Sequence, residues 1–268
     1  MPIVHHPTAL KLGPLEITGF GLAVLAAFAI SQIICQRELW RRGQDKEAAA
    51  IPDLVMAALL GTLIGAKTYY VILTGDPGAF LSRGGFVFWG GFMGAVALCF
   101  AVIRFKKLDF LRIADVAGIA IAAGYAVGRT GCWAVGDDYG RPWNGFLATQ
   151  FPEGAPPSTV AVMSDQFGIT FPAGTSPSEV VAVHPTQLYE TAMGFGMFAI
   201  LWAFRKHQHR EGWLFGLYCV VAGVERFIVE FFRAKDDRFF AGLTMAQVIA
   251  MGIALIGVTL MVSRRKPA

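Results

Sequence analysis

Seven apolar stretches of 18 to 23 residues follow one another along this chain and leave few ways for it to fold. A helix needs about 20 mostly apolar residues to cross roughly 30 Å of hydrocarbon. In this chain 55% of the residues are hydrophobic and 16% are charged, whereas about 25% are charged in soluble domains. We therefore predict an all-α integral membrane protein, a single polytopic domain over residues 1–268 with seven transmembrane helices. The predicted spans are residues 17–35, 51–73, 85–103, 114–135, 187–204, 213–232 and 243–262.

The basic residues of the loops indicate which way the chain crosses the membrane. Fourteen of the 23 Lys and Arg residues fall on one side of the predicted spans and six on the other. Because Lys and Arg accumulate in cytoplasmic loops, we expect the N-terminus outside and the C-terminus in the cytoplasm. The larger set is Arg37, Arg41, Arg42, Lys46, Arg104, Lys106, Lys107, Arg112, Arg205, Lys206, Arg210, Arg264, Arg265 and Lys266. The smaller set is Lys11, Arg83, Arg141, Arg233, Lys235 and Arg238.

One loop is much longer than the others, residues 136–185 between the fourth and fifth spans. It is rich in Gly, Pro, Ser and Thr, which favour turns and irregular backbone. A connection of this length in a compact protein usually has a function of its own. We predict a small outer, periplasmic-side head inserted at this point.

Ionisable side chains within the apolar stretches indicate where the chemistry lies. Such groups are costly in a membrane and mark a functional site by default, although internal ion pairs that fix the helices are the alternative. They are Lys67, Arg129, Glu190, Glu225, Arg226 and Glu230, with Asp137 and Asp138 just after the fourth span.

The densest cluster follows Arg129 at the outer end of the fourth span. A planar guanidinium binds a phosphate through two parallel hydrogen bonds. Cys132 is three residues from Arg129 and shares its helix face, and Asp137 and Asp138 follow where the chain leaves the membrane. The pattern predicts an anion site at the depth of lipid headgroups, with acid or base groups beside it. The four cysteines have no spacing typical of a metal site, so we expect no metal and no cofactor.

Two further clusters stand near the outer side. His184, Gln187 and Tyr189 lie at the start of the fifth span, and His184 is the histidine placed near both the membrane and the Arg129 region. In the sixth span Arg226 and Glu230 are four residues apart, a spacing that allows an ion pair. Arg226 is either half of a structural salt bridge or a second phosphate ligand held by Glu230. The second interpretation requires that spans four and six adjoin.

These clusters, in this order, resemble the prolipoprotein diacylglyceryl transferase family, the integral membrane enzymes of bacterial lipoprotein maturation. The resemblance extends over nearly the whole chain, and HPTQLYE at residues 184–190 and RFIVEFFR at 226–233 are its most specific strings. The other matching segments are residues 12–17, 65–71, 90–94, 128–141 and 243–247.

The resemblance implies a reaction and a location. The family transfers the diacylglyceryl group of phosphatidylglycerol to the lipobox cysteine thiol of a prolipoprotein and releases glycerol phosphate. The partners would be this anionic phospholipid and a membrane-bound prolipoprotein signal peptide, with no nucleic acid, at the bacterial plasma (inner) membrane. The residues that would contact substrate or line its cavity are Arg129, Arg226, Glu230, Cys132, Asp138, Gln187, Tyr189, Gly90 and Gly91.

The chain departs from the family pattern where thiol activation is concerned. Trp89 stands before Gly90 and Gly91 where the family has histidine, and an indole cannot act as a base. Cys132 and Asp137 stand where the family has Asn and Glu. Two positions where the family has tyrosine are Phe20 and Ala222.

A divergent transferase in which Asp137 or His184 replaces the missing base is the leading interpretation. A related lipid-group transferase with another acceptor is one alternative, and a thiolate of Cys132 that carries the lipid group covalently is another. A catalytically inactive phospholipid-binding scaffold is the interpretation from a different class. A transporter is less favoured, because no pair of broken half-helices is visible in matching positions.

Overall fold

The computed structural model describes residues 2–12, 15–82, 85–234 and 238–266. Arg83 and Lys235 of the outer basic set, and positions 13 and 14 of the first matching segment, lie outside these residues. The chain divides into two compact units, a first unit of residues 1–31 and 117–268 and a second unit of residues 32–116.

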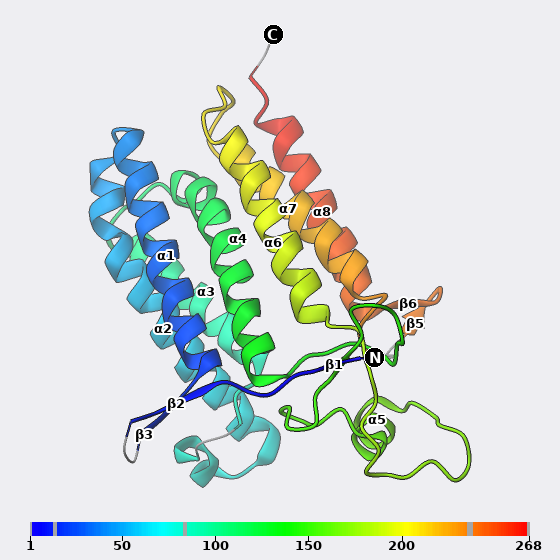
Figure 1. Cartoon of the computed structure of the whole chain (residues 1–268). Coiled ribbons are helices and arrows are strands. Elements are labelled where there is room, and N and C mark those ends of the chain that lie inside the picture. The colour runs from blue at the N-terminus through cyan, green and yellow to red at the C-terminus, as the bar shows by residue number, and fades with distance from the viewer. Residues whose placement is uncertain (1, 13–14, 83–84, 235–237, 267–268) are drawn as a thin grey trace. The chain divides into compact units, whose positions relative to one another are not determined.

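Most of the described chain is helical, as Figure 1 shows. Five of the described helices are long and apolar enough to cross a membrane: α1 (Gly19–Arg41), α2 (Asp45–Thr74), α3 (Phe88–Phe105), α4 (Phe110–Val135) and α8 (Met245–Ser263). α6 (Thr186–Phe204) and α7 (Trp213–Val229) occupy the fifth and sixth predicted spans and are not among the five. The prediction of an all-α membrane protein is confirmed in its coarse form, a mostly helical chain with several helices of membrane-spanning length.

The second unit is organised by close packing of α2 against α3. A Cβ added at Gly65 would lie 2.2 Å from the carbonyl oxygen of Gly90, and one at Gly94 would lie 2.2 Å from that of Gly61. Small residues let two helix backbones approach in this way. After α2 the chain forms a short 3-10 helix, η1 (Pro77–Leu81).

The first unit holds α6, α7 and α8 together with residues 117–135 of α4. α7 and α8 also pack through glycine, since a Cβ at Gly257 would lie 2.5 Å from the carbonyl oxygen of Gly216. α8 begins with a capping box, in which the Thr244 hydroxyl accepts from the backbone N–H of Gln247 and the Gln247 side chain accepts from that of Thr244. This arrangement satisfies donors at the helix start.

Residues 136–185 carry β4 (Thr149–Gln150) and α5 (Val160–Phe167) and surround a small hydrophobic core. Tyr139, Phe151, Met163 and Val183 are buried together in it. β1 (Ile3–Val4) pairs in parallel with β4 and joins the N-terminal segment to this region. Two short antiparallel pairs complete the strands described, β2 (Ala9–Leu12) with β3 (Leu15–Thr18) and β5 (Arg238–Phe240) with β6 (Leu243–Thr244).

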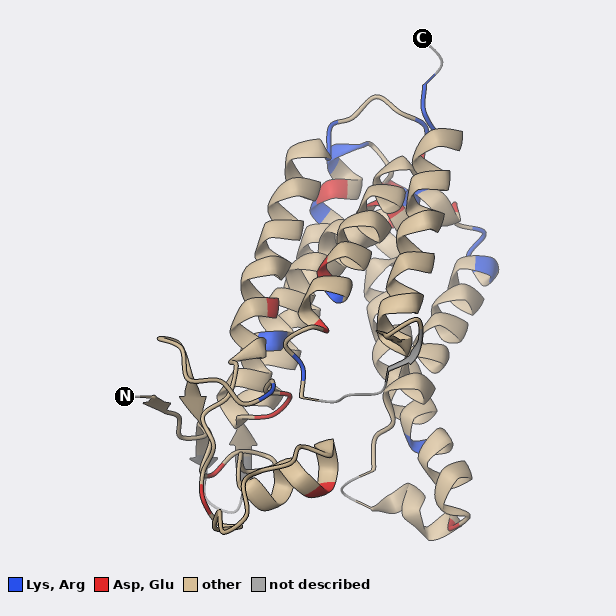
Figure 2. Cartoon of the chain, turned by 90° about the vertical axis from the view of Figure 1, so that its right-hand side faces the viewer, with Lys and Arg blue, Asp and Glu red and all other residues tan. Residues whose placement is uncertain are grey.

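Basic segments gather at one end of each unit. In the first unit the loop after α6 meets the C-terminal tail, because Arg210 donates its backbone N–H to the carbonyl of Arg264 at 3.0 Å; Figure 2 shows the blue ribbon of the two segments side by side. In the second unit Lys46 donates to the carbonyl of Lys107 at 2.8 Å. Within each unit, therefore, the segments placed on one side by the charge pattern lie together.

Candidate active site

The site is built where α4 ends in the first unit. Gly136 takes a positive φ of 70° and turns the chain out of the helix, so that Asp137 and Asp138 fold back toward the last turn of α4. Asp138 also has a positive φ, 55°, which is uncommon for a residue with a Cβ and typical of functional sites.

Arg129 is the centre of a network of two arginines and two carboxylates. Its guanidinium forms ion pairs with Asp138, at 2.9 Å from Oδ2, and with Glu190 of α6. Arg233, just after α7, reaches the same two acids, at 3.2 Å from Oδ1 of Asp138 and 3.7 Å from Oε1 of Glu190. We call these four residues the arginine–carboxylate quartet.

The quartet is balanced in charge and unequal in exposure. The Glu190 side chain is 2% exposed and that of Arg129 12% exposed, whereas that of Asp138 is 45% exposed. Breaking a buried ion pair leaves an uncompensated charge and is strongly destabilising. Partial burial acts to raise the pKa of Asp138, but Arg233 and Arg129 outweigh it and hold that pKa below its ordinary value. Asp138 is therefore a charged carboxylate that links both arginines and can move into water.

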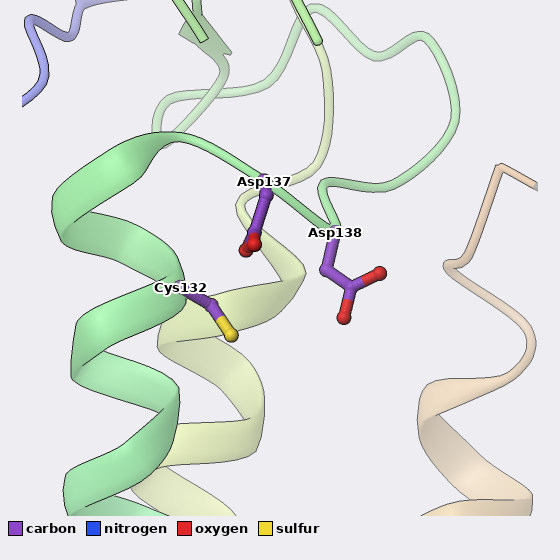
Figure 3. A group of neighbouring side chains, drawn as sticks. All are labelled: Cys132, Asp137 and Asp138. Carbon is purple, nitrogen blue, oxygen red and sulfur yellow. The ribbon is translucent and has the colours of Figure 1, made fainter. Parts of the chain in front are cut away.

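Cys132, Asp137 and Asp138 converge on one side of the quartet. Figure 3 shows the Cys132 side chain leaving the last turns of α4 and the two aspartates pointing from the following segment toward the same space. Their ligand atoms lie within 4.8 Å of one another. Arg129 already contacts two of the three, since its Nη1 is 3.4 Å from Sγ of Cys132 and 2.9 Å from Asp138. A metal ion at this point would face a guanidinium at close range, so the set does not fit a cation well.

Asp137 has the properties of a base. Burial raises its pKa to about 6, with the charge of Asp138 adding to the effect, so the carboxylate gains and loses a proton near neutral pH. One side-chain oxygen, Oδ1, is buried with no hydrogen-bond partner. Gln187 donates its Nε2 to the backbone carbonyl of Asp137 at 2.5 Å and fixes the backbone at this point.

His184 lies beside the site, in contact with the aromatic rings of Trp143, Tyr189 and Phe232. Its ring stacks on Trp143 with 4.3 Å between centroids, and its Nδ1 is 3.2 Å from the hydroxyl of Tyr189. Burial and the nearby Arg141 lower the pKa of His184, which makes the imidazole neutral at pH 7. Gly140 is pressed against it, because a Cβ at Gly140 would lie 2.8 Å from the Cβ of His184 and 2.2 Å from the carbonyl oxygen of Phe232. Only glycine fits there.

Arg226 and Glu230 form the ion pair that their spacing allows, with 2.6 Å between Nη2 and Oε2. Within the described residues neither makes a hydrogen bond or ion pair with Arg129. Glu230 is 4% exposed and lies within electrostatic range of Arg233. The pair thus borders the quartet without being part of it.

The chain resembles one family of known proteins over nearly its whole length. Residues 7–263 match the family model described as prolipoprotein diacylglyceryl transferase. The chain belongs to this family. It is 30% identical to the phosphatidylglycerol–prolipoprotein diacylglyceryl transferase of Solidesulfovibrio magneticus, over 97% of this chain and 95% of that protein. The enzymes of the same name from Geobacter sulfurreducens and Paracidovorax citrulli are 30% and 29% identical, over 97% and 98% of this chain and 96% and 97% of those proteins.

The glycine pair that the family resemblance offered for substrate binding lies in the second unit of this transferase. Gly90 packs against α2, where an added Cβ would lie 2.4 Å from both the carbonyl oxygen of Gly65 and the Cβ of Tyr69. Gly91 likewise packs on Thr62. The close packing of α2 against α3 is enough to explain why both positions are glycine, and their role in substrate binding stays a prediction. Trp89 is 49% exposed beside Phe88 and Phe92.

Two members of the quartet were missing from the predicted site. Glu190 was recognised as an ionisable group in a span, and Arg233 as a basic residue outside one, but neither was expected to contact Arg129. A signal did exist for Arg233, because it is seven residues after Arg226 and three after Glu230, close to one helix face. Nothing in the local sequence indicates that α6 brings Glu190 to the same point.

Proposed function

We propose that this family member transfers the diacylglyceryl group of phosphatidylglycerol to the lipobox cysteine thiol of a prolipoprotein. The sulfur–carbon bond forms while the carbon–oxygen bond of the donor breaks, and the electron pair leaves with glycerol phosphate. The observation that carries the proposal is the pair of guanidinium groups, Arg129 and Arg233, bridged by one partly exposed carboxylate. Two arginines that already share one carboxylate can also share a phosphate, and they would stabilise the negative charge that grows on it during the reaction.

Binding of the lipid headgroup begins with displacement of Asp138. The phosphate takes the place of the carboxylate between Arg129 and Arg233, and Asp138 swings toward water, where its side chain is already 45% exposed. Glu190 stays behind and holds both arginines in position. The network remains neutral, because one anion replaces another.

Asp137 then takes the proton of the acceptor thiol. A free thiol has a pKa near 8.5 and needs a base at neutral pH, and a carboxylate with a pKa of about 6 is close to the optimum for that task. His184 is the second candidate for the base. The Asp137 carboxylate shares its space with Cys132 and Asp138, whereas the His184 ring is engaged by Trp143 and Tyr189, so Asp137 is favoured.

The arrangement in the membrane is part of the proposal. In it, α6 and α7 join the five helices that are long and apolar enough to cross a membrane, which gives seven spans in total. Residues 136–185, with their own small core, form the outer head over the site. The N-terminus is outside and the C-terminus in the cytoplasm of the bacterial inner membrane, consistent with the basic segments that meet at one end of each unit.

The test is thioether formation by the purified protein. Phosphatidylglycerol and a lipobox peptide are incubated with it, and mass spectrometry is used to look for diacylglyceryl peptide and released glycerol phosphate. An established family enzyme in the same assay is the positive control. If that control is active and this protein makes no product, the lipoprotein acceptor is wrong; labelling of another acceptor would then indicate a related transferase.

A further inference from the structure

A second polar pair lies inside the first unit, one helical turn along α4 from Arg129. The hydroxyl of Tyr125 on α4 donates to Oε1 of Glu225 on α7 at 2.9 Å. Glu225 is 6% exposed, and Tyr125 is only half-buried. None of the steps proposed above uses either residue, although burying a carboxyl group in an apolar helix is costly and by default indicates a function.

Tyr125 lies on the same face of α4 as Arg129 of the quartet. It precedes Arg129 by four residues, which places both on one face of α4, about 6 Å apart along the helix axis. α6 lines that face, because Glu190 pairs with Arg129 and an added Cβ at Gly194, one turn later, would lie 3.1 Å from Cδ1 of Tyr125. In the proposed orientation, Tyr125 is therefore deeper in the membrane than Arg129, where the same two helices, α4 and α6, meet.

This depth matches a particular part of a phospholipid. When the phosphate rests on Arg129 and the acyl chains point into the membrane, the glycerol backbone and its two ester groups come next. The ester carbonyl oxygens are the hydrogen-bond acceptors at that depth. A hydroxyl or carboxylic acid one helical turn below Arg129 is in the right place to donate to one of them.

Glu225 is a buried carboxyl group without a basic partner in contact in the part of the chain that the structure describes, and burial of an unpaired carboxyl group favours its neutral form. The groups that act on it are Tyr125 and Arg129 from α4, Glu190 from α6, and Arg226 from α7, with Tyr218 also in range. α8 contributes no ionisable side chain. Arg129 and Arg226 are already paired with Glu190 and Glu230, and within the described residues no basic nitrogen is within ion-pair distance of Glu225.

A neutral acid hydrogen-bonded to a tyrosine has two O–H donors. One is used in the bond between the two side chains, and the other remains for a ligand. An ionised Glu225 would accept the tyrosine hydroxyl and leave no donor. The protonated form thus gives the pair a function that a simple structural hydrogen bond does not have.

We propose that Tyr125 and Glu225 form a subsite for an ester carbonyl of the donor lipid and so select diacyl over dialkyl phospholipid. The placement of the ester rests on the proposed function, because it assumes that the lipid phosphate sits on Arg129. An ether-linked analogue has the same headgroup and chains but lacks the carbonyl, so loss of this subsite is expected to abolish the preference between the two lipids.

The experiment is a competition for binding that needs no turnover. Full-length protein is incubated with equal amounts of ester-linked and ether-linked phosphatidylglycerol of the same chain length, and native mass spectrometry gives the ratio retained. The wild type is expected to favour the ester by about fivefold, the value of one ordinary hydrogen bond. The double variant Tyr125→Phe with Glu225→Leu removes both donors and is expected to lower the ratio to about one, while Glu225→Gln, whose amide still donates, preserves it.

Tyr218→Phe is the matched control, because it removes another tyrosine hydroxyl of the first unit, on α7, and is expected to leave the ratio unchanged. Equal retention of the two lipids by the wild type, retention of neither, or an unchanged ratio in the double variant would overturn the subsite and leave a structural hydrogen bond. If this double variant does not fold, Tyr125→Phe with Glu225→Met, which also removes both donors, decides. Absence of thioether product with a clear ester preference would contradict the proposed transferase reaction and keep the subsite, so the two failures are distinguishable.

Discussion

Arg129 and Lys67 are both cations inside apolar helices, yet their surroundings differ in kind. Arg129, on α4 of the first unit, is held by the carboxylates of Asp138 and Glu190. Lys67, on α2 of the second unit, donates its Nζ to the carbonyl oxygen of Ser82 at 2.6 Å and to the Ser82 hydroxyl at 3.1 Å. The ring of Phe86 lies 4.7 Å from the same nitrogen.

The comparison separates the cation that we propose to bind the lipid phosphate, Arg129, from one that anchors a neighbouring segment, Lys67. Burial does not distinguish them, since Lys67 is 7% exposed and the Arg129 side chain 12%. The partners do. An exposed carboxylate such as that of Asp138 can give way to another anion, whereas backbone carbonyls and an aromatic ring fix Lys67 to the segment that follows α2.

Arg129→Ala is expected to have the largest effect. Loss of the guanidinium removes the group that stabilises the leaving phosphate, and transfer falls by about 100- to 1,000-fold. Thioether formation at saturating lipid measures it, and Lys67→Ala is the matched variant of the second unit. The assignment of phosphate binding to Arg129 is wrong if the two variants lose activity equally.

Asp137→Asn is expected to lower transfer by about 100-fold at pH 8, as loss of a general base does. In the wild type the carboxylate is available above its pKa of about 6, so activity rises with pH through that region. The variant loses this rise. The raised pKa of Asp137 affects stability in the opposite direction. A carboxyl group whose pKa is raised on folding stabilises the folded protein below about pH 4. This contribution is lost as the pH rises through about 6.

A parallel series with His184→Gln decides between the two candidate bases. If the rise in activity near pH 6 survives Asp137→Asn and disappears with His184→Gln, the base is the histidine. Thermal unfolding of Asp137→Asn between pH 4 and 8 checks the linkage independently, since the variant is expected to lose less stability over this range than the wild type.

The sequence predicted the helices better than the site, for physical reasons. The length of an apolar stretch in the sequence predicts the part of a helix that crosses the hydrocarbon, but it does not predict the polar ends of that helix. α1 continues from the predicted end at residue 35 to Arg41 because Glu38 pairs with Arg41 and Arg42. α4 begins at Phe110, four residues before the predicted start, where Asp109 accepts from the N–H of Leu111 and so caps the helix.

Within the site, local pairs were predictable and distant ones were not. Arg129 and Asp138 are close in the chain, and the turn at Gly136 brings them together. Glu190 and Arg233 reach the same point only because α4, α6 and the end of α7 pack side by side. That packing depends on small residues such as Gly194, which carry no information about which partner they face.

Lys67→Met tests the anchoring half of the comparison. The variant keeps an unbranched apolar side chain and loses the donors to Ser82 and Ala79. Hydrogen exchange of the η1 segment is expected to accelerate about tenfold, the equivalent of one hydrogen bond to a charged group. Transfer is expected to fall by much less than in Arg129→Ala. Unchanged exchange in η1 would show that other contacts hold this segment.

Asp138→Asn is expected to have the smallest effect, and in the opposite direction. In the proposed mechanism the carboxylate, which pairs with Arg129 and Arg233, competes with lipid phosphate for them, and partly exposed ion pairs are worth at most about 1 kcal/mol. KM for phosphatidylglycerol is therefore expected to fall by up to about fivefold, with kcat little changed. Asp165→Asn, on the exposed face of α5, controls for the change in net charge. A KM that rises instead would mean that Asp138 binds the headgroup directly, and the quartet would then be a completed site and not one that exchanges its anion.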